Sequence, residues 1–256
     1  MANTFFRTFS AEQYKLSKNR EIFGVLLLPV LLVFMVDGYI IYKANTEVFA
    51  ESITNPWTVL LGRYIFQFYY LLYPILVAIF VYACCDIEYK NNNYKILFTI
   101  PISKTEIFFS KALFITFVIL FSVVLSYLAF LLSGYFLSLM YPEIGFQNYD
   151  YREVIFYTFF KLFFTLSAIS MIQLSISLAF NSFIYPIGFS MFMLVFSIVV
   201  AQKEFSDFIP YTGTYKSFEN IMTESNSFAR LDYSNIVMIF LFLLVSYYLF
   251  KRKRII

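Results

Sequence analysis

The longest uncharged stretch of this chain, Leu162–Gln202, contains 41 residues without a single Asp, Glu, Lys or Arg. As one straight helix it would be roughly 61 Å long, about twice the thickness of the hydrocarbon core of a bilayer. Asn181-Ser182, followed by Pro186, supplies a break within it. The stretch therefore predicts two membrane-spanning helices that fold back on one another.

The composition of the whole chain also indicates an integral membrane protein. It is 61% hydrophobic and only 14% charged, whereas soluble globular domains carry roughly 25% charged residues. The absence of histidine excludes haem ligation by His, His-containing zinc sites and Ser-His dyads. The net charge of +3 comes from short clusters beside apolar runs, which does not favour a nucleic-acid partner.

Counting apolar runs of membrane length predicts an all-α fold with six transmembrane helices in a single domain, 1–256. A helix needs about 20 apolar residues to cross the hydrocarbon core. The predicted spans are 22–42, 59–85, 112–141, 153–180, 183–202 and 233–250.

The distribution of Lys and Arg predicts the orientation, because cytoplasmic loops retain the positive residues. Twelve of the 19 lie before the first span, after the second or behind the sixth, and five lie in the other connections. We therefore expect a multi-pass protein of the inner or plasma membrane with both termini in the cytoplasm.

Two further segments carry helical signals outside the predicted spans. Residues 1–21 mix phenylalanines with basic residues, and Ser10-x-x-Gln13 fits a capping box, which predicts a short interfacial helix. The outer loop 203–232 is rich in aromatic residues, which predicts short re-entrant helices before the sixth span.

The polar segment 86–111 between the second and third spans contains the stop and start signals of two helices. Pro101 ends the first helix within a residue or two. Ser103-Lys104-Thr105-Glu106 is a capping box that starts a new helix leading into the third span. Because the charge count places this segment in the cytoplasm, it is suited to docking a soluble partner.

This segment resembles the one that follows the second span of ABC-2 type exporter permeases. The resemblance is carried by Glu88, Tyr94-Lys95-Ile96-Leu97, Pro101-Ile102-Ser103 and Ser110-Lys111, and by Glu12-x-x-Lys15-Leu-x-Lys18 before the first span. Asn91-Asn92-Asn93 stands where relatives often have Gly-Thr. The most similar branch contains permeases of peptide-antibiotic immunity, for bacitracin and lantibiotics.

The resemblance implies a membrane-spanning permease that moves an amphipathic, peptide-like or lipid-like substrate out of the cell. The partners implied are cytoplasmic ABC ATPase subunits, which bind the ATP and magnesium, and a second permease copy or homologous permease. The chain itself would bind no cofactor. The coupling helix that docks the ATPase would use Glu88, Asn91, Tyr94, Lys95, Leu97, Phe98, Pro101, Ser103 and Lys104.

Three charged residues, Asp37, Arg63 and Lys161, fall inside predicted spans. A charge at the bilayer centre costs about 2.5 to 3.5 kcal/mol on insertion scales unless it is paired or hydrated. The three residues would therefore form ion pairs, reach the headgroups by snorkelling or line a polar path for the substrate.

The sequence argues against catalysis by this chain alone. Its sole Lys-Thr pair, Lys104-Thr105, lacks the glycines of a phosphate-binding loop, so ATP hydrolysis would need another subunit. An intramembrane enzyme is the least favoured alternative, because it would need polar residues that converge at one depth and the chain has no histidine to serve among them. The competing interpretation is a membrane scaffold that recruits a cytoplasmic protein and transports nothing.

Overall fold

The computed structural model describes residues 2–17, 20–44, 55–89, 102–222 and 228–252. All regular structure in these ranges is helical. The longer helices are α1 (Ala2–Ser17), α2 (Arg20–Ala44), α4 (Phe66–Tyr89), α6 (Lys104–Met140), α7 (Arg152–Ala179), α8 (Ile184–Val200), α9 (Pro210–Met222) and α10 (Arg230–Arg252). The short ones are α3 (Pro56–Thr58), a π-helix η1 (Val59–Ile65), and the 3-10 helices η3 (Pro142–Ile144), η4 (Phe146–Asn148) and η5 (Glu204–Phe208).

Among the residues that the structure describes, five stretches are long and apolar enough to cross a membrane, which confirms the multi-pass prediction in its coarse form. They are Ile22–Tyr42, Pro56–Glu88, Lys104–Met140, Arg152–Ala179 and Arg230–Arg252. The predicted fifth span corresponds to α8, which is also apolar but has only 17 residues. Its length is about 25 Å, somewhat short of a full crossing.

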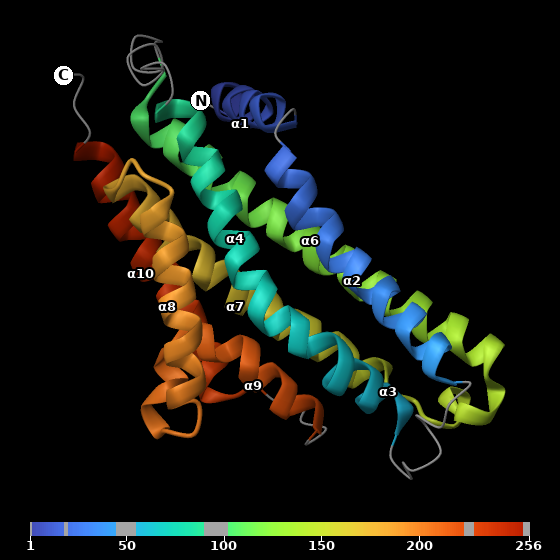
Figure 1. Cartoon of the computed structure of the whole chain (residues 1–256). Helices are drawn as coiled ribbons and strands as arrows, with labels where there is room; N and C mark the ends of the chain where they lie inside the picture. The colour runs from blue at the N-terminus through green and yellow to red at the C-terminus, as the bar shows by residue number, and fades with distance from the viewer. Residues whose placement is uncertain (1, 18–19, 45–54, 90–101, 223–227, 253–256) are drawn as a thin grey trace.

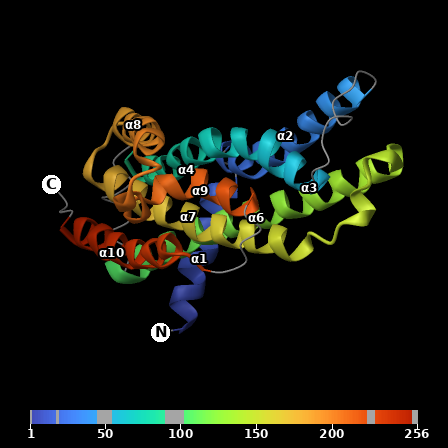
Figure 2. The same cartoon turned by 90° about the horizontal axis from the view of Figure 1, so that it is seen from below.

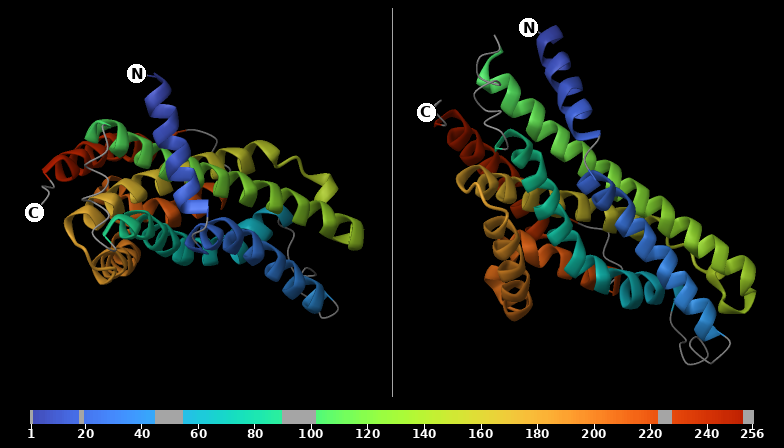
Figure 3. Two further views of the ribbon diagram at one scale, coloured as in Figure 1. Left: turned by 90° about the horizontal axis from the view of Figure 1, so that it is seen from above. Right: turned by 45° about the horizontal axis from the view of Figure 1, so that its top comes forward.

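The long helices run side by side, and α1 lies across one end of them (Figures 1 and 3). That end, which we call the terminal end, carries both termini, the end of α4 and the beginning of α6 (Figure 1). The opposite end, the far end, carries α3 and the turn between α6 and α7. The arrangement brings the described parts of the three predicted cytoplasmic segments to one end of the molecule.

Helix α7 is the centre of the bundle. Nineteen of its 28 residues are buried, and it packs against α4, α6, α9 and α10. Small residues such as Ser167, Ala168 and Ser170 let these neighbours approach closely. Helix α9 lies along α7 (Figure 2), where a Cβ on Gly213 would come within 2.8 Å of the Thr165 hydroxyl.

A proline inside α2 is accommodated by hydroxyl groups of its neighbours. Pro29 has no N–H, so the carbonyl of Val25 lacks its partner within the helix. The Ser122 hydroxyl donates to that carbonyl at 2.7 Å, and the Tyr69 hydroxyl donates to the Pro29 carbonyl at 3.0 Å. These bonds join α2 to α6 and to α4. The Ser122 bond also satisfies the freed Val25 carbonyl, which in lipid would otherwise have no partner.

Candidate functional site at the terminal end

The beginning of α6 is fixed by the predicted capping box, which the structure confirms. The Ser103 hydroxyl accepts a hydrogen bond from the Glu106 N–H at 3.2 Å, and the Ser103 N–H donates to the Glu106 carboxylate at 3.3 Å. Two backbone groups at the helix start are thereby satisfied. The box sets where the chain enters α6 from the segment 90–101.

Lys111, two turns into α6, is the centre of a charged cluster. Its side chain is 1% exposed, and its Nζ lies 2.6 Å from Glu88 Oε1 and 3.9 Å from Glu12 Oε2. The same Nζ donates to the Cys84 carbonyl at 2.7 Å. We call Lys111, Glu88 and Glu12 the charged junction. It joins α1, α4 and α6 at one point.

A second contact reinforces the attachment of α1. Its Thr8 hydroxyl lies 2.7 Å from the Ser110 hydroxyl, and both groups are buried. The ring of Phe9 packs edge-on against Phe114 and Phe117 of α6. Helix α1 is thus held by an ion pair, a hydrogen bond and aromatic contacts, instead of resting loosely on the bundle.

The charged junction holds together the two helix ends that residues 90–101 connect. Glu88 lies in the last turn of α4, Lys111 lies near the start of α6, and residues 90–101 connect these two helices. Each unpaired ion would be costly to bury, so the pair favours one geometry for the two ends of the segment. The junction therefore fixes the end of α4 relative to the beginning of α6.

The predicted docking residues fall into two groups. Glu88 is 3% exposed and faces the bundle, whereas Ser103 is exposed and Lys104 half-buried at the start of α6. The others, Asn91, Tyr94, Lys95, Leu97, Phe98 and Pro101, lie outside the described residues. Sequence reasoning did not single out Lys111 or Glu12 as site residues, although a lysine opening a long uncharged run is a usable signal.

The three charged residues predicted inside spans do not form one group. Asp37 is buried and accepts a hydrogen bond from the Ser133 hydroxyl of α6. Lys161 is 2% exposed and pairs with Asp232 of α10, its Nζ 3.8 Å from Oδ2. Arg63 lies in the π-helix η1. The acidic partner of Lys161 is therefore Asp232, which the sequence analysis placed in the outer loop, and not Asp37.

Further polar contacts along α7 link it to α9 and α10. The Asn235 amide donates to the Thr165 hydroxyl at 3.0 Å, and the Gln173 amide donates to the Tyr211 hydroxyl at 2.6 Å. Burial raises the pKa of Tyr211 to about 12, which keeps this hydroxyl neutral. Within the described ranges, no cluster of three His, Cys, Asp or Glu residues forms a metal site.

Comparison with known families decides the class of the protein. The family described as ABC-2 family transporter protein matches residues 8–197, which include most of α1 and everything from α2 to α8 apart from its last three residues. The chain belongs to the ABC-2 transporter family. Membership indicates a membrane permease component of an ABC transporter, and it implies an ABC ATPase as partner.

Neither the search of curated proteins nor the search of solved structures gave a significant match. The three residues of the charged junction, Glu12, Glu88 and Lys111, all lie inside the matched residues 8–197.

Proposed function

We propose that this ABC-2 permease is the membrane subunit of an exporter whose ATP hydrolysis is performed by a separate cytoplasmic ATPase. The observation that carries the proposal is the charged junction, which fixes both ends of the segment 90–101 at the end of the molecule where the termini lie. A segment clamped in this way transmits a push from a docked protein to α4 and α6 at once.

In this proposal Glu88 contributes to docking indirectly. Its carboxylate is buried against Lys111, so it acts by holding the segment and not by touching the ATPase. Contact with the ATPase is assigned to Tyr94, Lys95 and Phe98, on the resemblance to the family's coupling helix. The chain needs no catalytic residue or cofactor of its own, because the ATP and magnesium bind to the partner.

In this proposal the substrate leaves between two permeases, and each copy crosses the membrane six times with its termini in the cytoplasm. Helix α8 is the additional span in this arrangement. A groove of about 570 Å³ opens between α2 and the η1–α4 helix, with lining side chains that include Met35, Tyr64 and Gln67. Its mixed apolar and polar lining suits an amphipathic cargo, such as the peptides handled by the permeases that the polar segment resembles. Helix α9 acts as the outer re-entrant element.

Co-purification with the ATPase tests this proposal. The full chain is expressed with its candidate ATPase, reconstituted in lipid nanodiscs and assayed for retained ATPase and for ATP turnover. We expect Tyr94→Ala with Phe98→Ala to lose most of the bound ATPase. Phe136→Ala with Tyr233→Ala is the matched control, because it removes exposed aromatic rings distant from the segment. A complex that forms equally well in both variants would contradict the assignment of docking to Tyr94 and Phe98, whereas no complex at all would favour the scaffold alternative.

A further inference from the structure

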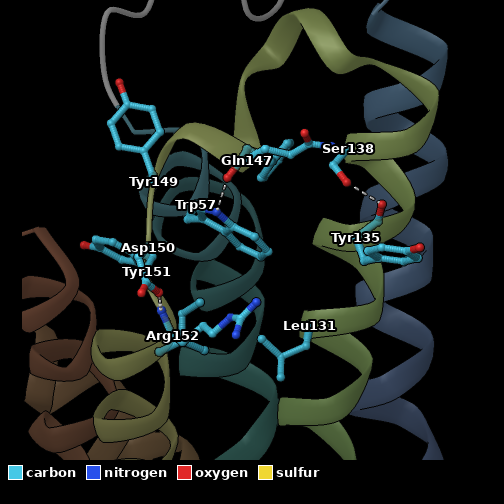
Figure 4. A pocket seen from close by; sticks show the side chains of 11 residues that line it. Trp57, Leu131, Tyr135, Ser138, Gln147, Tyr149, Asp150, Tyr151 and Arg152 are labelled. Atoms are coloured by element: carbon cyan, nitrogen blue, oxygen red, sulfur yellow. Dashed lines mark hydrogen bonds between the residues drawn. The ribbon is translucent and has the colours of Figure 1, made fainter.

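The far end of the molecule contains a cavity of about 610 Å³ that is unrelated to the charged junction. It lies between α3, the last turns of α6, the turn after them and the beginning of α7 (Figure 4). Its size is within the range of roughly 300 to 1,000 Å³ that is typical of small-molecule sites.

One wall of this cavity is a rigid aromatic surface. The ring of Trp57 lies directly on Gly134, where an added Cβ would come within 2.1 Å of the ring. The indole N–H donates to the Phe146 carbonyl at 3.0 Å, and the Phe146 and Phe130 rings pack edge-on against the indole at 5.0 and 5.8 Å. The wall is therefore formed before any ligand binds.

The cavity also holds a cation, the guanidinium of Arg152. Figure 4 shows the guanidinium of Arg152 directed into the space below Trp57. Asp150 turns its carboxylate to the backbone N–H of Arg152 at 3.4 Å, away from the guanidinium. Among the described residues, no carboxylate forms an ion pair with Arg152.

The length of α6 places this cavity at the level of the lipid headgroups. Lys111 and Tyr135 are 24 residues apart on α6, which corresponds to about 36 Å, slightly more than the hydrocarbon core. If the charged junction lies near one membrane surface, Tyr135 and Trp57 lie near the other. Trp and Tyr are enriched at this level, where their rings meet the headgroups.

We propose that the Trp57 cavity binds the headgroup region of a phospholipid from the leaflet at the far end. The guanidinium of Arg152 holds the phosphodiester, since its planar fork matches two phosphate oxygens. The Trp57 and Tyr135 rings and Leu131 receive the glycerol and the first methylene groups. This site is independent of the substrate that the permease exports.

Fluorescence of the purified full chain tests the site, because Trp57 is its only tryptophan. The protein in a sugar detergent is titrated with phosphatidylglycerol that carries brominated acyl chains, which quench indole emission on contact. The same acyl chains on a glucosyl headgroup provide a lipid without phosphate. We expect half-maximal quenching at about tenfold lower mole fraction for the phospholipid, as one charge-assisted contact provides.

Variants assign the effect to Arg152. Arg152→Gln should remove the preference for the phospholipid, and Arg152→Lys should keep part of it. Arg230→Gln is the control, because Arg230 is also exposed and its guanidinium lies over the Phe208 ring at 5.1 Å. Unfolding curves of each variant verify that the bundle is intact.

Three results would overturn the proposal. The first is equal quenching by both lipids, and the second is an unchanged preference in Arg152→Gln. The third is competition by soluble glycerol phosphate at the same concentration as the lipid, which would indicate a site for free anions. If Arg152→Gln does not fold, Tyr135→Ala removes an exposed ring of the same cavity and should weaken quenching by the phospholipid.

Discussion

Lys111 and Lys161 are both buried lysines in long apolar helices, but they are held in different ways. Lys111 has two carboxylates and a backbone carbonyl around it, from α1 and α4. Lys161 has Asp232 at 3.8 Å, and that carboxylate also accepts the Ala229 N–H at 2.8 Å at the start of α10. The first lysine assembles three helices, whereas the second ties α10 to α7.

The difference teaches what each pair can do. Removing Lys111 would leave two carboxylates buried without this cation, which is costly. The positions of the three side chains in the charged junction are therefore strongly favoured. Removing Lys161 would leave Asp232 with a backbone partner at a helix N-terminus, a position that favours a negative charge. The terminal end thus depends on ion pairing more than the α7–α10 contact does.

The largest effect is expected for Lys111→Met, which keeps the side-chain length and removes the charge. It should lower the free energy of unfolding by about 3 to 5 kcal/mol, as when one partner of a buried pair is lost. Equilibrium unfolding in mixed micelles measures this. Lys251→Met, at an exposed position in the last turn of α10, is the control, and equal unfolding midpoints for the two variants would contradict the prediction.

Lys161→Met should cost less, about 1 to 3 kcal/mol, because Asp232 retains its hydrogen bond from Ala229. Adding Asp232→Asn should recover part of the loss. The same unfolding assay applies. If Lys161→Met destabilises the protein as much as Lys111→Met, the distinction between the two lysines is wrong.

Gly213→Ala tests whether close packing, and not charge, holds the surroundings of Lys161. The new Cβ would meet Thr165 at 2.8 Å and Leu231 at 3.1 Å, so we expect a loss of about 1 to 3 kcal/mol from overpacking. Gly188→Ala, a glycine of α8 with nothing within 4 Å, should be neutral or slightly stabilising. Equal stability of the two variants would argue that α9 is loosely packed.

The smallest effect is expected for Ser103→Ala, which removes the cap of α6 and leaves the charged junction in place. The loss should be about 1 kcal/mol. Ser10→Ala, at an exposed position inside α1, is the control and should be near neutral. A loss as large as that of Lys111→Met would mean that capping, and not the junction, fixes the segment.

Features set by local sequence could be predicted. The break near Asn181 is confirmed, because α7 ends at Ala179 and α8 begins at Ile184. The cap at Ser103 is confirmed as well. The capping box at Ser10 is wrong, since α1 is continuous from Ala2 to Ser17 and Ser10 lies within it. An exposed serine tolerates a helix interior when the helix packs on a neighbour, as α1 does on α6.

Features set by contacts between distant helices could not be predicted. Asp232 was assigned to a loop, and its pairing with Lys161 depends on how α10 packs on α7. Trp57 and Gly134 are 77 positions apart, and only the close approach of α3 to α6 makes the glycine necessary. Periodicity along one helix contains no information on which residue of another helix it will meet.

The binding of the ATPase to permease nanodiscs tests the central claim most directly, namely that the charged junction holds the docking segment. The dissociation constant is measured for the unaltered chain, Lys111→Met and Lys251→Met at a temperature where all three are folded. We predict a dissociation constant at least about tenfold higher for Lys111→Met and an essentially unchanged one for Lys251→Met. An ATPase that binds Lys111→Met as tightly as the unaltered chain would contradict the account.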